Sequence, residues 1–251
     1  MIVSHEHRFI FMKTTKTAGT SVELFLSRIA GEDAIVTPVE PVEAGHEPRN
    51  YRGPRIYNPL PALLADPDQA RALARHPRRK FGFYRSYRNH TPAWLARARL
   101  GRKVWNSYFK FCFERNPWDK AVSRYWWSVQ GMSNRPTLDE FVIRGHARLK
   151  SDWPIYGFGD RISVDRVGRY EHLVDDLTSI LGEIGVSKEV ELPRAKSTQR
   201  RRDETVGFSP EAADRIGAIF HREVAAFGYE CPRDLLLPGP GAGQRSPIGT
   251  G

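Results

Sequence analysis

The sequence feature that most constrains the fold is a short apolar run, Phe9-Ile-Phe-Met12, followed by a polar loop and an amphipathic segment. Apolar residues of the amphipathic segment recur at the spacing of one helix face. These residues are Val22, Phe25, Leu26 and Ile29. Gly31 follows the last of them, as glycine often follows a helix. The spacing predicts a unit of strand, loop and helix.

The loop inside this unit has the composition of an anion site. A loop that leads into a helix presents unpaired backbone N–H groups and the positive end of the helix dipole. Gly19 allows close backbone approach and Lys16 adds positive charge. Hydroxyl donors come from Thr17, Thr20 and Ser21. The loop is not a Walker A motif, because Lys16 precedes the glycine. An ordinary turn whose Thr and Ser cap the helix is the alternative interpretation.

A second unit of this kind begins at Tyr108–Phe113, a segment of high β-propensity. Pro117 is well placed to start the helix that follows. Between strand and helix stands the polar sequence Glu114-Arg115-Asn116. In α/β sheets, ligands bind where the carboxyl ends of strands lead into helices. The loops after the two strands would therefore flank one ligand.

The rest of the chain continues the alternation of strand and helix signals. The expected elements are a helix over 66–76, an extended segment over 80–87, a helix over 93–100 that ends at Gly101, a capping box over 137–140, a strand over 161–167, a helix over 173–184 and a last helix from Pro210 to Phe227. This order predicts an α/β fold with three layers, a parallel sheet covered by helices on both faces. We expect a single domain over 1–237, followed by a disordered Pro/Gly tail over 238–251.

Positive charge is concentrated in one segment. The formal net charge is +10, and residues 71–103 hold eleven Lys or Arg and no Asp or Glu. A concentrated basic region indicates an anionic partner such as a nucleic acid, a membrane surface or a charged small molecule. A solvated basic helix face is the alternative.

Targeting and metal signals are weak. No run approaches the roughly 18 apolar residues of a membrane span, and the amino-terminal residues do not resemble a signal peptide, so we expect a cytoplasmic protein. The two cysteines, Cys112 and Cys231, are far apart and lack metal-type spacing. No metal site is expected.

Four segments, in their order and spacing, resemble motifs of sulfotransferases that use 3′-phosphoadenosine 5′-phosphosulfate (PAPS), of the branch that includes carbohydrate sulfotransferases. The segment 16–21 resembles the 5′-phosphosulfate loop of that family, and 115–123 resembles its 3′-phosphate motif. Residues 169–173 resemble its Tyr-Glu-x-Leu segment, and 226–229 resemble the usual close of the domain. The resemblance implies a P-loop-NTPase-like sheet and a transferase activity.

The resemblance implies a role for each matching residue. The 5′-phosphosulfate would be held by Lys16, Thr17, Ala18, Gly19, Thr20 and Ser21. Arg115 and Ser123 would hold the 3′-phosphate, and Tyr170 would lie by the adenine. Lys196, in a basic loop over 193–208, completes the expected cofactor-binding residues. The product would be adenosine 3′,5′-bisphosphate.

Sulfuryl transfer to a hydroxyl or amine requires positioning, neutralisation of charge on the leaving phosphate, and removal of the acceptor's proton. Lys16 is the candidate for neutralisation. His90 is the first candidate for the base and Glu114 the second. A histidine that only packs at a helix start is the alternative for His90. The family usually has His and Pro where Lys13 and Thr15 stand, and an apolar residue at Glu114, which weakens any inference about the acceptor.

Two other classes of protein function stay open. A P-loop-type kinase would require a Walker-type lysine and an acidic Mg²⁺ ligand. A nucleic-acid-binding module would use the basic region with its interleaved aromatic residues. Under the sulfotransferase hypothesis, the partner is a small-molecule or carbohydrate acceptor, which we expect to be anionic, and no nucleic acid is expected. The sequence does not indicate an oligomeric state.

Overall fold

The computed structural model describes residues 1–52, 86–145, 149–193 and 207–237. Its contacts divide the chain into two compact units. We call Met1–Arg115 with Asp152–Ser197 the sheet unit, and Asn116–Ser151 with Thr198–Gly251 the helical unit. The prediction of one domain over 1–237 stays a prediction. The helix expected over 66–76, nearly all of 80–87, Lys196 and the tail lie outside the described residues.

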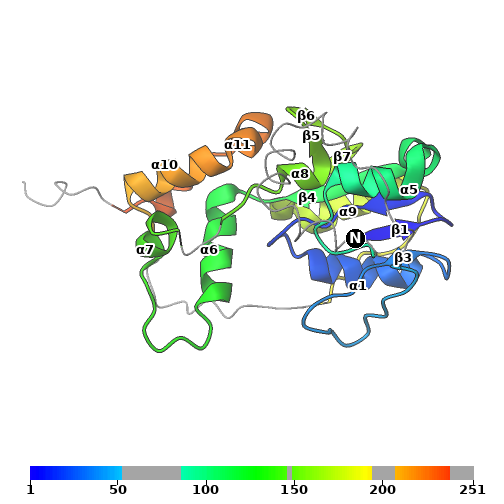
Figure 1. Ribbon diagram of the computed structural model, residues 1–251, viewed down its shortest axis with the longest axis horizontal. Coiled ribbons are helices and arrows are strands. Elements are labelled where there is room, and N and C mark those ends of the chain that lie inside the picture. Colours follow the sequence, from blue (N-terminus) through cyan, green and yellow to red (C-terminus); the bar gives the residue numbers. More distant parts are fainter. Residues whose placement is uncertain (53–85, 146–148, 194–206, 238–251) are drawn as a thin grey trace, which may run out of the picture. The chain divides into compact units, whose positions relative to one another are not determined.

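A five-stranded sheet forms the centre of the sheet unit, in the order β3-β1-β2-β4-β7 (Figure 1). The strands are β1 (Ile2–Ser4), β2 (Phe9–Phe11), β3 (Ile35–Val36), β4 (Phe109–Glu114) and β7 (Arg166–Arg169). β4 runs parallel to β2 and β7, with Phe11 opposite Phe111. β1 runs antiparallel to β2 and β3, so the sheet is mixed at one edge. The α/β class is confirmed.

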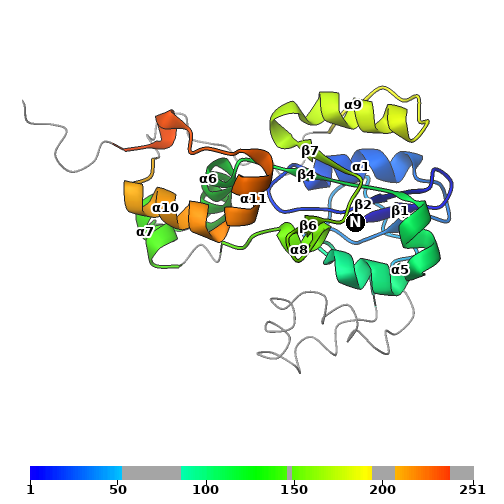
Figure 2. The same cartoon turned by 90° about the horizontal axis from the view of Figure 1, so that it is seen from above.

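Apolar side chains bury one face of this sheet beneath two helices. The helices are α1 (Gly19–Ile29) and α9 (Leu173–Glu183). The shared core contains Phe9, Phe11, Phe111 and Phe113 from the strands, and Val22, Leu26, Leu177 and Ile180 from the helices. α5 (Ala93–Ser107) lies on the opposite side of the sheet (Figure 2). The expected three layers are therefore present.

Two expected boundaries in the sheet unit are wrong. The helix expected over 93–100 continues past a kink at Gly101, whose φ is 79°, as far as Ser107. The strand expected over 161–167 is divided between two pairings. β6 (Arg161–Ile162) pairs with β5 (Gly157–Phe158), and only β7 joins the main sheet. The division arises because Ser163 N donates back to Tyr156 O at 2.8 Å.

The helical unit packs short helices around aromatic residues. These helices are α6 (Pro117–Ser128), α7 (Leu138–Ile143), α10 (Pro210–Ile219) and α11 (His221–Phe227). Pro117 begins α6 as predicted, and the Asn116 side chain accepts from Trp118 N at 3.1 Å. The capping box at Thr137 and Glu140 is confirmed. The expected last helix is two helices, because the buried Phe220 at their junction has φ −105° and ψ 27°.

Candidate functional site

The candidate site lies in the sheet unit, at the carboxyl ends of β2 and β4. Beyond β2, Met12 N donates to Phe111 O at 2.8 Å, and the Thr14 hydroxyl donates to Phe113 O. The Thr14 and Thr17 hydroxyls lie 2.9 Å apart. These contacts fix the start of the loop against the neighbouring strand, so the loop enters α1 in one defined conformation.

The loop reaches α1 through two residues in the left-handed backbone region. Lys16 has φ 59° and Ala18 has φ 54°, although neither is glycine. Such conformations cost free energy and gather at functional sites. Ala18 is the amino-terminal cap of α1 and no side chain caps this helix, so the interpretation of the Thr and Ser residues as caps is wrong. The first N–H groups of α1 therefore have the geometry that favours an anion.

Gly19 is required by the packing below the loop. A Cβ at this position would lie 2.8 Å from Lys13 Cγ and 3.4 Å from Thr14 O. The Lys13 stem therefore occupies the space that a side chain at position 19 would need. The close approach of an anion to the Gly19 backbone stays a prediction.

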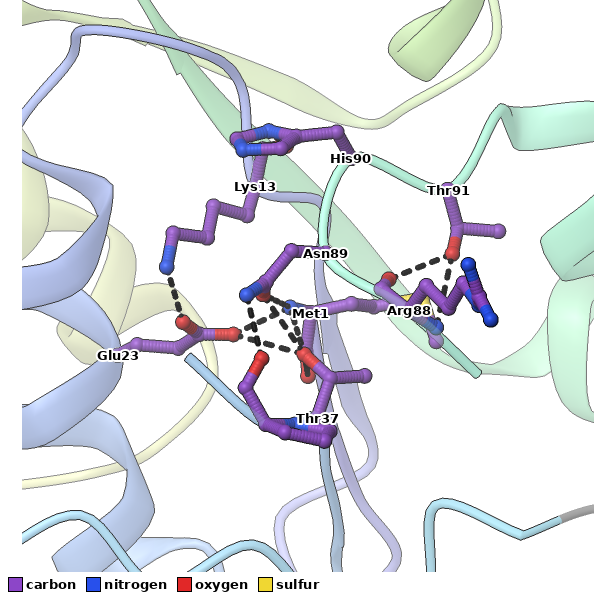
Figure 3. A network of polar contacts seen from close by, with 9 residues as sticks. Met1, Lys13, Glu23, Thr37, Arg88, Asn89, His90 and Thr91 are labelled. Atoms are coloured by element: carbon purple, nitrogen blue, oxygen red, sulfur yellow. Dashed lines mark hydrogen bonds and ion pairs between the residues drawn. The ribbon is translucent and has the colours of Figure 1, made fainter. Parts of the chain in front are cut away.

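A buried ionic cluster lies behind the loop (Figure 3). The Glu23 carboxylate is fully buried and accepts from the Met1 amino group, from Lys13 Nζ and from the Thr37 hydroxyl. Burial raises the pKa of Glu23, but the positive charges of Met1 and Lys13 outweigh it and lower that pKa to about 2. Asn89 joins the cluster, because its Oδ1 accepts from the Met1 amino group at 3.4 Å and lies 2.9 Å from Thr37 Oγ1. The cluster therefore anchors the residue that precedes His90.

His90 is held beside the loop by a backbone contact. Its Nδ1 lies 2.9 Å from Lys13 O, and its own φ is 57°. The pKa of His90 lies below its ordinary value, because protein atoms displace water from the ring, while the Asp152 carboxylate opposes this shift. The residue as a whole is exposed, although protein atoms surround much of its ring. An imidazole that is neutral near pH 7 has the protonation state that a general base requires.

Arg115 brings three of the expected cofactor-binding residues together. Its NH1 donates to Lys16 O at 3.3 Å, and its Cζ lies 4.1 Å from the centre of the Tyr170 ring. Tyr170 stands in a short 3₁₀ helix, Tyr170–His172, directly after β7. Stacking on an aromatic face fixes the plane of a guanidinium. The structure thus groups Lys16, Arg115 and Tyr170.

Glu114, the second candidate base, is fully buried at the end of β4. Its Oε1 accepts from Arg115 N at 2.8 Å, and its Oε2 accepts from the Tyr156 hydroxyl at 3.0 Å. A carboxylate with a donor on each oxygen stabilises the turn after the strand. This geometry favours His90 over Glu114 as the base.

Two expected residues are not brought to this group by the described structure. Ser123 lies on α6, in the helical unit, and its expected pairing with Arg115 stays a prediction. Lys196 lies outside the described residues, as do residues 71–85 of the basic region.

Sequence reasoning did not single out Glu23 and Asp152, which contact Lys13 and Thr15 in this loop. Asp152 is 4% exposed, and its Oδ2 accepts from both Thr15 N and Thr15 Oγ1 at 2.7 Å. For Glu23 the available signal was an acidic residue between the apolar neighbours Val22 and Leu24. For Asp152 the signal was an Asp two residues before Pro154, a common helix start.

Two features are absent from the described ranges of the chain. None of their helices combines the length and the apolar character that crossing a bilayer demands. Within those same ranges, no three His, Cys, Asp or Glu side chains are grouped so as to hold a metal ion.

The fold and the site define an α/β protein with a candidate anion-binding loop at the carboxyl end of a central strand. No protein-family model matches the chain. An uncharacterized protein of Archaeoglobus fulgidus is 34% identical over 113 residues, which cover 40% of this chain and 88% of the archaeal protein. The chain belongs to the same family as that archaeal protein.

Among solved structures, a sulfotransferase from Alicyclobacillus acidocaldarius is similar to this chain, with 17% sequence identity and a TM-score of 0.42. The match covers 89% of this chain and 96% of the other.

Proposed function

We propose that this protein is a sulfotransferase that moves a sulfuryl group from PAPS to a hydroxyl or amine acceptor. The observation that carries the proposal is the uncapped amino end of α1, reached through strained Lys16 and Ala18, with Arg115 held against the same loop. One ligand with two separate anionic groups suits two such positive positions.

The residues present fit this cosubstrate. The backbone N–H groups at the start of α1 and the Lys16 side chain would hold the 5′-phosphosulfate, because both favour a negative group. Arg115 would hold a phosphate through its guanidinium edge, and Tyr170 keeps that group in plane. Ser123 and Lys196 complete the proposed binding residues.

The proposed chemistry assigns one task to each side chain. Lys16 neutralises the negative charge that develops on the leaving bisphosphate as its bond to sulfur breaks. His90 accepts the proton of the acceptor as the new bond to sulfur forms. Part of His90 is exposed at the surface, and the acceptor would approach from that side.

Calorimetric titration tests the proposal with adenosine 3′,5′-bisphosphate, without a divalent metal, beside ATP and 5′-AMP. We expect tight binding of the bisphosphate alone. At about 100 times its dissociation constant it should stabilise the fold by about 2.7 kcal/mol.

Lys16→Ala should weaken this binding, whereas Lys103→Ala, at an exposed lysine of α5, should not. Equal binding of ATP would contradict the proposal and favour a kinase. Salt-sensitive binding of random RNA without binding of the bisphosphate would favour a nucleic-acid-binding module.

A further inference from the structure

The segment 13–15 is held from two sides, by His90 and by Asp152. On one side, Lys13 O lies 2.9 Å from His90 Nδ1. On the other, Asp152 Oδ2 accepts from Thr15 N and Thr15 Oγ1, both at 2.7 Å. His90 and Asp152 are therefore linked through three consecutive residues of one loop.

The contact with Lys13 determines which nitrogen of His90 carries the proton. A backbone carbonyl oxygen can only accept a hydrogen bond, so Nδ1 must be the donor. In the neutral ring the lone pair is then on Nε2. Nε2 is accordingly the atom that can take a proton from a substrate.

The Asp152 side chain does not cap the helix that follows it. Asp152 occupies the amino-terminal cap position of α8 (Trp153–Tyr156), yet its side chain makes no capping hydrogen bond there. The carboxylate points instead to Thr15 and is 4% exposed. A buried carboxylate close to an imidazole stabilises the imidazolium that forms when the ring gains a proton.

Five influences act on the charge of the His90 ring. The displacement of water lowers its pKa, and so do the positive charges of Lys13 and the Met1 amino group. The Asp152 carboxylate and the hydrogen bond to Lys13 O raise that pKa. Asp152 is thus the carboxylate that favours the protonated ring.

We infer that Lys13 O and Asp152 are positioning groups for His90: the carbonyl fixes the proton on Nδ1, and the carboxylate stabilises the imidazolium. This inference deepens the proposed function and rests on it for the identity of the reaction. As the acceptor oxygen or nitrogen bonds to sulfur, its proton moves to Nε2, and the electron pair of the broken bond stays on the leaving phosphate.

The direct test is an NMR titration of the ¹⁵N-labelled imidazole of His90, assigned by comparison with His90→Gln. In the wild-type protein we expect the neutral ring to carry its proton on Nδ1. Asp152→Asn should lower the pKa of His90, because the stabilising charge is lost. A neutral ring protonated on Nε2, or an unchanged pKa in Asp152→Asn, would overturn the inference.

Asp165→Asn is the matched control. Asp165 Oδ2 also accepts from a backbone N–H, that of Lys110 at 2.7 Å, and pairs with Lys110 Nζ at 2.8 Å. The Asp165→Asn variant should leave the titration of His90 unchanged. If Asp152→Asn does not fold, Asp152→Ser retains an acceptor for Thr15 N without the charge, and the wild-type proton position is measured without any variant.

Kinetics supply a second readout. In Asp152→Asn, turnover at the plateau should fall by about tenfold or more, because the imidazolium is less stabilised. The acid limb of the pH profile should move to lower pH at the same time. A merely structural defect would lower the plateau turnover without moving the acid limb of the pH profile. This result would count against the inference.

Binding of the bisphosphate tests the proposed function separately from the positioning of His90. If the bisphosphate does not bind, the sulfotransferase proposal fails. The proton position and the titration of His90 still decide whether Lys13 O and Asp152 control the ring.

Discussion

His90 and Lys16 would contact different substrates, and this difference separates their roles experimentally. His90→Asn should lower turnover by roughly 10² to 10⁴, because a general base acts on the acceptor's proton. Its affinity for the bisphosphate should stay near the wild-type value. Single-turnover kinetics together with calorimetry measure both quantities.

His221 provides the control for this variant, because its Nδ1 also contacts a backbone carbonyl, Ala218 O, at 3.2 Å. His221→Asn should retain full turnover. In the wild-type protein, turnover should rise with pH through the His90 pKa, which lies below the usual histidine value. Near-normal turnover of His90→Asn would refute the assignment of His90 as the base.

Glu23 should give the protein an acid-sensitive stability. Its folded pKa of about 2 lies below the ordinary value of 4.5, so its contribution is complete above pH 4.5 and is lost as pH falls toward 2. A shift of this size corresponds to roughly 3 kcal/mol. Denaturant melts across this pH range should show the loss, and Glu23→Gln should abolish most of this pH dependence.

Glu23→Gln should also destabilise the fold by roughly 3–5 kcal/mol at neutral pH, because Lys13 then stays buried without its carboxylate. The double variant Lys13→Met/Glu23→Gln should recover part of this loss. A double variant less stable than Glu23→Gln alone would show that the ion pair is not the main contribution.

At the scale of single residues, the sequence was most informative for residues that belong to a recognisable motif. Lys16, Arg115 and Tyr170 were predicted and lie together. The partners of His90 were not predicted, because they are a backbone oxygen and an Asp that is distant in sequence. Contacts of this kind depend on tertiary folding, which local patterns do not encode.

Among the elements, α5 shows that a local signal can predict a backbone conformation correctly and still predict the wrong helix end. Gly101 adopts φ 79° and ψ 158°, a backbone conformation that is nearly restricted to glycine. The predicted stop is therefore present, but the helix resumes after it. The buried Trp105 secures the second part, through a contact that the helix-end rule does not include.

Gly101→Ala should destabilise the fold by about 1–3 kcal/mol, although no atom lies within 4 Å of the new Cβ. The loss of stability would come from the backbone conformation alone. Gly182→Ala in α9 is the matched control, because its Cβ also meets nothing within 4 Å and its φ is not positive. It should stabilise by up to about 1 kcal/mol. Equal effects in thermal melts would contradict this account.

The prediction of one strand over 161–167 was wrong for a different reason. Its alternating residues fit a strand, but two competing pairings divide it between β6 and β7. Strand type is set by local composition, whereas the partner of a strand is set by the whole sheet. The parallel core of β2, β4 and β7 was predictable from the order of elements, and the antiparallel edge at β1 was not.

For the whole molecule, the excess positive charge of 71–103 predicts how an acceptor is attracted. We propose that the acceptor is anionic, so catalytic efficiency should fall as salt rises from low to physiological concentration. One described member does not contribute, because Arg99 is buried and donates to Ser86 O at 2.8 Å. Efficiency that does not change with salt would show that this region serves another purpose.

The division of the sheet unit into two sequence segments has a consequence for biosynthesis. A ribosome releases β4 and then the whole of 116–151 before it releases β7, the strand that covers the outer edge of β4. Until then, that edge is open to pairing with other nascent chains, and the apolar face beneath α9 lacks its cover. The nascent protein therefore depends on rapid synthesis of residues 116–183, which end with β7 and α9, and premature termination between β4 and β7 yields an aggregation-prone fragment.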